Sequence, residues 1–117
     1  MITLQETKRE MARDPKNWKI YLADFADDFR RGKDPRAFSE PLKAPLDRWD
    51  SLLASTLEML CQKTGIPIPS WTDQVPAVKD PWFVAGLENL KAIALAESPL
   101  AFRIRKIFVT SGFLSRV

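Results

Sequence analysis

The chain has 117 residues, which suits one domain with a single core. Apolar residues make up 45% of it, charged residues 28%, and the formal net charge of +3 neither requires nor excludes nucleic acid. Histidine is absent and Cys61 is the one cysteine, which excludes an intrachain disulfide and histidine-based catalysis or metal binding. We find neither a signal peptide nor an apolar run of the ~20 residues that a membrane span requires, so we expect a cytoplasmic protein.

The first third of the chain predicts two helices. A short amphipathic helix is expected around residues 5–13. Asp14-Pro15 has the pattern of an N-cap followed by proline at the first helical position, which predicts a second helix up to Gly32. Gly32 is expected in the left-handed position after that helix. Apolar side chains spaced four, three and four residues apart share one face of it: Trp18, Leu22, Phe25 and Phe29.

The strongest helical pattern covers residues 46–64, after a connection with one turn of helix around residues 36–38. Pro45 precedes this helix and Gly65 ends it. Its main apolar stripe consists of Leu46, Trp49, Leu53, Leu57 and Leu60. The residues expected to face away from the core are Arg48, Ser51, Ser55, Glu58 and Gln62. Leu52 and Met59 lie off the stripe, one heptad apart, and are expected to contact a second element or a partner.

Proline and tryptophan recur together in the second half, in residues 66–71 (IPIPSW) and 80–83 (DPWF). Proline fixes φ and lacks an N–H donor, so we expect an extended loop to about residue 79 and a short turn carrying Trp82 and Phe83. The segment from Leu87 to Leu95 is apolar nearly all round, which predicts a buried helix. Ser98-Pro99 predicts the N-cap of a last helix. Residues 107–110 have strand-like composition but no obvious partner strand.

These elements predict an all-α fold. We expect a single helical domain over residues 1–117, with four to six helices, proline-rich connections and room for one short extended segment near the C-terminus.

Four groups of residues could carry chemistry, and each has a structural interpretation that we favour. Asp24, Asp27 and Asp28 could hold a cation, but one helix supplies too few oxygen ligands, and Asp27 is expected to pair with Arg31. Cys61 lies at the edge of the apolar stripe, and Ser98 fits a helix cap. Asp47 and Asp50 are explained by helix capping and the helix dipole. We therefore expect no catalytic residue, metal or cofactor.

A basic strip interleaves cations with apolar residues near the C-terminus. Its cations are Arg103, Arg105, Lys106 and Arg116. They could follow a nucleic-acid backbone, although four cations are few for that purpose. We favour an amphipathic element with its charges outward and the following residues inward: Phe102, Ile104 and Ile107.

The aromatic residues also have two interpretations. Most are expected in the core. Trp71 follows two prolines in an expected loop and is the best candidate for an exposed anchor, because tryptophan is enriched at the energetic centres of interfaces.

Three segments of the second half resemble a family of small uncharacterised bacterial proteins. They are residues 65–72 (GIPIPSWT), 80–83 (DPWF) and 97–109 (ESPLAFRIRKIFV), and the family pattern runs approximately from P-x-W through P-W-F to S-P-x-x-F-R-x-R-x-I-F-V. Residues 12–15 (ARDP) and 27–30 (DDFR) extend the likeness over most of the chain, whereas Lys106 stands where the resemblance leads us to expect asparagine. Similar segments follow helix-turn-helix domains in antitoxin-like regulators or stand beside toxin-like nucleotidyltransferase genes.

The resemblance implies an interaction module and supplies no catalytic residues. We expect a protein–protein interaction module, an antitoxin-like partner of a toxin-type enzyme, that binds its partner through Trp71, Leu52 and Met59. The alternative is a nucleic-acid-binding regulator that uses the basic strip, and an enzyme is the third class.

Overall fold

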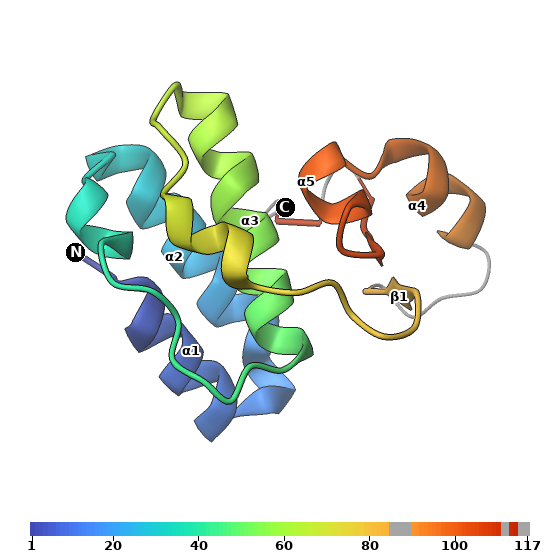
Figure 1. Ribbon diagram of the computed structural model, residues 1–117, viewed down its shortest axis with the longest axis horizontal. Helices are drawn as coiled ribbons and strands as arrows, with labels where there is room; N and C mark the ends of the chain where they lie inside the picture. The colour runs from blue at the N-terminus through green and yellow to red at the C-terminus, as the bar shows by residue number, and fades with distance from the viewer. Residues whose placement is uncertain (85–89, 111–112, 115–117) are drawn as a thin grey trace.

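The computed structural model describes residues 1–84, 90–110 and 113–114. The described residues form five α-helices and one parallel pair of two-residue strands (Figure 1), so the all-α prediction is confirmed. The helices are α1 (Leu4–Arg13), α2 (Trp18–Gly32), α3 (Arg48–Thr64), α4 (Lys91–Glu97) and α5 (Leu100–Arg103). The strands are β1 (Trp82–Phe83) and β2 (Ile107–Phe108). Short 3-10 helices connect these elements: η1 (Pro15–Asn17), η2 (Pro35–Phe38) and η3 (Ser70–Gln74).

The junction between α1 and α2 differs from the prediction. Asp14 does not cap the backbone of α2. Its carboxylate accepts hydrogen bonds from the side chains of Asn17 (2.9 Å) and Tyr21 (2.7 Å), and α2 begins at Trp18. At the other end, Lys33 rather than Gly32 takes the left-handed conformation, with φ 49°, and its N–H donates to a carbonyl of the last turn. Both ends of α2 are therefore closed by contacts that the sequence pattern does not specify.

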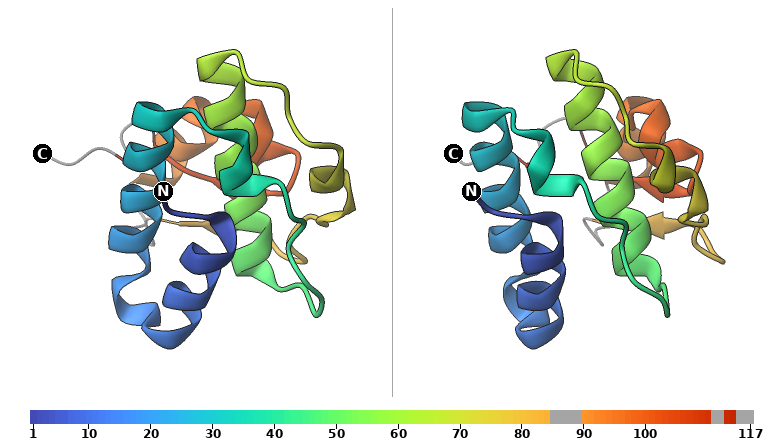
Figure 2. Two further views of the ribbon diagram at one scale, coloured as in Figure 1. Left: turned by 90° about the vertical axis from the view of Figure 1, so that its left-hand side faces the viewer. Right: turned by 60° about the vertical axis from the view of Figure 1, so that its left-hand side comes forward.

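Helix α3 is the centre of the fold. It lies between the α1–α2 pair and the C-terminal elements (Figures 1 and 2), and every residue from 50 to 61 is buried. It starts at Arg48, two residues later than predicted, because the Asp47 carboxylate accepts the N–H groups of Trp49 (3.0 Å) and Asp50 (3.3 Å). It ends at Thr64, as predicted, and Gly65 is the C-cap residue in the left-handed conformation, with φ 75°.

The expected solvent-facing side of α3 is largely buried, so that part of the prediction is wrong. Ser51, Ser55 and Glu58 are all buried, because η3 and the segment after it cover this side of the helix. The Ser51 hydroxyl donates to the Pro76 carbonyl at 2.7 Å. The carbonyls of an irregular segment have no partners in a helix or sheet, so they need other hydrogen-bond donors, and polar side chains of α3 supply some of these donors.

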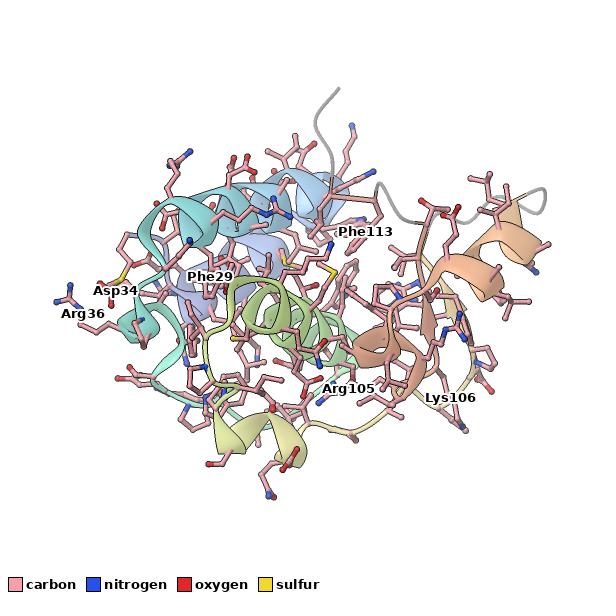
Figure 3. All side chains as sticks on the ribbon, turned by 90° about the horizontal axis from the view of Figure 1, so that it is seen from above. Phe29, Asp34, Arg36, Arg105, Lys106 and Phe113 are labelled. Carbon is pink, nitrogen blue, oxygen red and sulfur yellow. The ribbon has the colours of Figure 1, made fainter. Side chains whose placement is uncertain are left out.

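Arg105 completes this polar interface. Its side chain is buried, and both guanidinium Nη atoms donate to the Glu58 carboxylate. The same guanidinium donates to the carbonyls of Thr72 (2.8 Å) and Val75 (3.2 Å) and to the Ser55 hydroxyl (3.3 Å). Figure 3 shows Arg105 directed into the molecule beside α3, whereas Lys106 lies at the outer edge. One side chain thus connects the turn after α5 to η3 and α3.

The strand-like segment near the C-terminus does have a partner. β1 and β2 pair in parallel, with Trp82 opposite Ile107 and Phe83 opposite Phe108. The expectation of a turn at residues 82–83 is therefore wrong. Such a pair could not be recognised from composition, because two residues are too few to show a period of two.

Helix α4 is not the buried helix that its composition predicts. Leu87 lies outside the described residues, and of α4 only Ala94 is buried, while Ile93 and Leu95 are exposed. The correction has a simple cause: α4 rests on the protein along one narrow side, so its other apolar side chains remain at the surface.

Ser98 closes α4 and does not cap α5. Its hydroxyl donates to the Ala94 carbonyl and accepts the Val109 N–H at 2.8 Å, while Pro99 occupies the N-cap position of α5. The predicted cap is therefore wrong. Ser98 instead connects the end of α4 to the residue that follows β2.

We predict that Arg105→Met lowers the free energy of unfolding by about 3–5 kcal/mol, because it leaves the Glu58 carboxylate buried without its cation. Arg36→Met is the matched control, since Arg36 pairs with Asp34 at an exposed site where an ion pair contributes less than about 1 kcal/mol. Urea unfolding followed by circular dichroism measures both. Equal losses of unfolding free energy in the two variants would show that the buried ion pair contributes no more to stability than the exposed one.

Candidate protein-interaction site

The residues predicted to bind a partner are not gathered on one surface. Leu52 and Met59 belong to the core, with 0% and 5% of their surface exposed. Their prediction as partner-binding residues is wrong, because α3 is covered on several sides and positions off its main stripe are covered too. Trp71 is half-buried against the core, and its indole N–H donates to the Phe38 carbonyl at 3.0 Å. A role for Trp71 in binding a partner stays a prediction.

The predicted basic strip is not continuous. Arg105 is 4% exposed and paired with Glu58, so its charge is not available to a phosphate. The Arg103 guanidinium donates to the carbonyls of Ser98 (2.6 Å) and Ala96 (2.8 Å), close to the end of α4. Lys106 is exposed, and Arg116 lies outside the described residues.

The inward and outward residues around α5 also differ from the prediction. Phe102 and Ile107 are buried as expected, but Ile104 is 57% exposed while Arg105 is buried. Leu100, four residues before Ile104, is 69% exposed. The Arg105 side chain points inward because the Glu58 carboxylate and the carbonyls of the loop region accept its hydrogen bonds there. The neighbouring Ile104 side chain therefore points outward.

The residues considered for chemistry have structural contacts. Asp28 accepts the Ile2 N–H at 2.8 Å and lies 3.8 Å from Arg31, while Asp27 pairs with Arg30 rather than with the predicted Arg31. Among the residues that the structure describes, no group of three acidic, histidine or cysteine side chains is placed to hold a metal ion.

Three tryptophans from distant parts of the chain meet at the start of α3. The rings of Trp18 and Trp49 have centroids 5.6 Å apart, and those of Trp49 and Trp82 are 5.4 Å apart in an edge-to-face arrangement. All three are partly buried against the core. Edge-to-face ring pairs are favoured by the ring quadrupoles, so the cluster is ordered while part of each ring stays at the surface.

Arg48 lies over this cluster. Its guanidinium carbon is 4.7 Å from the centre of the Trp82 ring and 5.3 Å from that of Trp49. Such cation–π contacts contribute about 0.5–1 kcal/mol each at exposed sites. We name Arg48, Trp18, Trp49 and Trp82 the tryptophan–arginine surface.

A cavity of about 450 Å³ opens beside this surface, and we name it the α3 cavity. Its walls include Trp82 and the prolines and aliphatic residues of two loops: Leu46, Pro76, Val78 and Pro81. Charged side chains also line it: Asp47, Arg48, Lys79 and Asp80. An apolar space bordered by a few charges is typical of a binding site.

Sequence reasoning missed this site. Trp18 and Trp49 fall on apolar stripes and were expected in the core, and Trp82 was expected in a turn. The available signal was that Arg48 adjoins Trp49 at a helix start. The site becomes visible only with the β1–β2 pair, because that pairing places Trp82 beside α3.

Comparison with family models, curated proteins and solved structures finds no match for the chain. The resemblance to antitoxin-like regulators therefore stays a prediction. None of the helices within the described ranges is long and apolar enough to cross a membrane.

The structural role of Cys61 can be tested through the pH dependence of stability. It is buried in the core, and burial together with the Glu58 carboxylate raises the pKa of its thiol to about 11 from an ordinary value near 9. Between pH 9 and 11 the unfolded chain then loses a proton that the folded chain keeps, so stability falls as pH rises. Relative to Cys61→Ala, we expect the wild type to lose roughly 1–3 kcal/mol more across this range.

Urea unfolding of both proteins at several pH values measures this difference. The alanine variant controls for the lysine and tyrosine titrations that the two proteins share. Parallel pH profiles would show that the thiol ionises as freely in the folded protein as in the unfolded one.

Proposed function

We propose that the chain is a protein–protein interaction module of the bacterial cytoplasm and that the tryptophan–arginine surface is its contact site. One observation carries the proposal: the Trp49 ring contacts the rings of Trp18 and Trp82, Arg48 lies over Trp49 and Trp82, and all three rings are only partly buried, with Trp82 in the wall of the α3 cavity. Tryptophan and arginine dominate the energetic centres of protein interfaces. Side chains that are already ordered lose little entropy on binding.

The finer role that we propose is that of an antitoxin-like partner of a toxin-type enzyme. It rests on the resemblance of residues 65–72, 80–83 and 97–109 to antitoxin-like proteins. Two of these segments contribute to the site, since Trp82 belongs to the second and the third contains the strand that pairs with β1.

The placement of the two reactive candidates and of Arg105 also favours binding over the alternatives. The Cys61 thiol is buried with a raised pKa, and the Ser98 hydroxyl is bonded to backbone groups on both sides. Arg105, a member of the proposed nucleic-acid strip, is occupied by Glu58. These contacts give each residue a structural role and leave the tryptophan–arginine surface as the best supported site.

We predict that Trp82→Ala weakens capture of the cellular partner by about 30-fold or more, the effect of losing ~2 kcal/mol at an interface hot spot. Tagged protein would be returned to cells of the encoding organism, and co-purifying proteins would be quantified by mass spectrometry. Trp71→Ala is the comparison variant, because it removes the other indole predicted to bind a partner, which neither lines the α3 cavity nor contacts the tryptophan cluster. Urea unfolding of both variants confirms that each remains folded.

A specific partner that is retained by the wild type and Trp71→Ala, and lost by Trp82→Ala, supports the proposal. Equal capture by all three proteins argues against this surface, and loss in Trp71→Ala alone would place the contact at Trp71.

A further inference from the structure

We propose that Arg48 binds a carboxylate of an acidic peptide segment in the partner protein, and that an apolar side chain next to this carboxylate enters the α3 cavity. The inference rests on the proposed function and names the chemistry that the site recognises.

Arg48 packs on two aromatic rings and has no acidic partner among the described residues. Its guanidinium packs on the rings of Trp49 and Trp82, at 5.3 and 4.7 Å from their centres. Within residues 1–84, 90–110 and 113–114, no carboxylate forms an ion pair with it. Arg36 shows the contrast, since its guanidinium is occupied by Asp34 through three hydrogen bonds of 2.7–3.1 Å.

Stacking on aromatic rings leaves the N–H groups at the edge of a guanidinium available. Those groups match the two oxygens of a carboxylate, and a guanidinium that is already oriented loses little freedom on forming the pair. Arg48 therefore combines the charge, the donors and the order that carboxylate recognition requires.

The α3 cavity supplies the apolar half of the site. Leu46, Val78 and Trp82 give it apolar walls beside Arg48, and Lys79 adds a second cation without an ion-pair partner among the described residues. The Asp47 carboxylate is engaged by two N–H groups of α3. A partner peptide with an acidic residue next to a large apolar one could thus place its carboxylate on Arg48 and its apolar side chain in the α3 cavity.

The same charges favour a peptide over a nucleic acid. Asp47 and Asp80 line the cavity that Arg48 and Lys79 border, so a chain of phosphates would meet two carboxylates there. Nucleic-acid affinity depends on neutralising several phosphates, and this site offers two cations. A single carboxylate needs only one of them.

Selection from a library of random 12-residue peptides displayed on phage tests the inference with the folded wild-type protein. We expect the enriched peptides to carry aspartate or glutamate next to a large apolar residue. Synthetic copies would then be titrated by calorimetry. Arg48→Gln should weaken their binding by about tenfold or more, the usual effect of losing hydrogen bonds to a charged group. The affinity of Arg48→Lys for these peptides should lie between those of the wild type and Arg48→Gln, because lysine keeps the positive charge but lacks the planar pair of donors.

Arg9→Gln is the matched control, since it removes one exposed cation from α1 and should leave binding unchanged. Competition with a random single-stranded 20-nucleotide DNA completes the design. Enriched peptides without an acidic residue, no enrichment at all, equal binding by Arg48→Gln, or full displacement by the DNA would each overturn the inference.

The outcome is separable from that of the proposed function. Loss of a cellular partner in Trp82→Ala but not in Arg48→Gln would support the interaction surface and contradict the carboxylate contact. Equal capture by the wild type and Trp82→Ala would contradict the interaction surface, whatever the peptides show.

Discussion

A single buried guanidinium connects the two halves of this protein. Arg105 meets the carboxylate of Glu58 on the central helix, the hydroxyl of Ser55, and the carbonyls of Thr72 and Val75 in the loop region. Because a buried charge without partners is strongly unfavourable, this arrangement allows few alternatives. Removing any one partner leaves polar atoms that water cannot reach. The constraint therefore determines how the proline-rich segment lies on α3.

The candidate site depends on this constraint through the backbone. The carbonyl of Arg105 accepts the Val78 N–H at 3.0 Å, and the carbonyl of Lys106 accepts the Trp82 N–H at 2.9 Å. Those two bonds place β1 beside β2 and bring the Trp82 ring against Trp49. The buried ion pair of Arg105 and Glu58 thus helps to position Trp82, a partly exposed member of the tryptophan cluster.

Two arginines of the chain illustrate how environment assigns a role to one residue type. Arg105 is surrounded by acceptors and is structural. Arg48 lies over the rings of Trp49 and Trp82, and its guanidinium forms no ion pair with any carboxylate that the structure describes. The donors of Arg105 are occupied within the fold, whereas those of Arg48 are the ones that we propose to bind a ligand. Neither difference is visible in composition, since both residues adjoin large apolar neighbours in the sequence.

The sequence by itself determined the all-α class, the extent of α2 and α3 to within a few residues, and the end of α3 before Gly65, because helix periodicity and helix ends are local properties. Only the tertiary structure decided that the serines and Glu58 of α3 are buried, that Ile104 faces outward, and that the tryptophans meet. Periodicity identifies one apolar face of a helix, but a polar residue on another face is buried only when a distant part of the chain packs on it and supplies its hydrogen bonds. For Glu58 that partner is Arg105, 47 residues away in the sequence, so no local pattern could predict the pair.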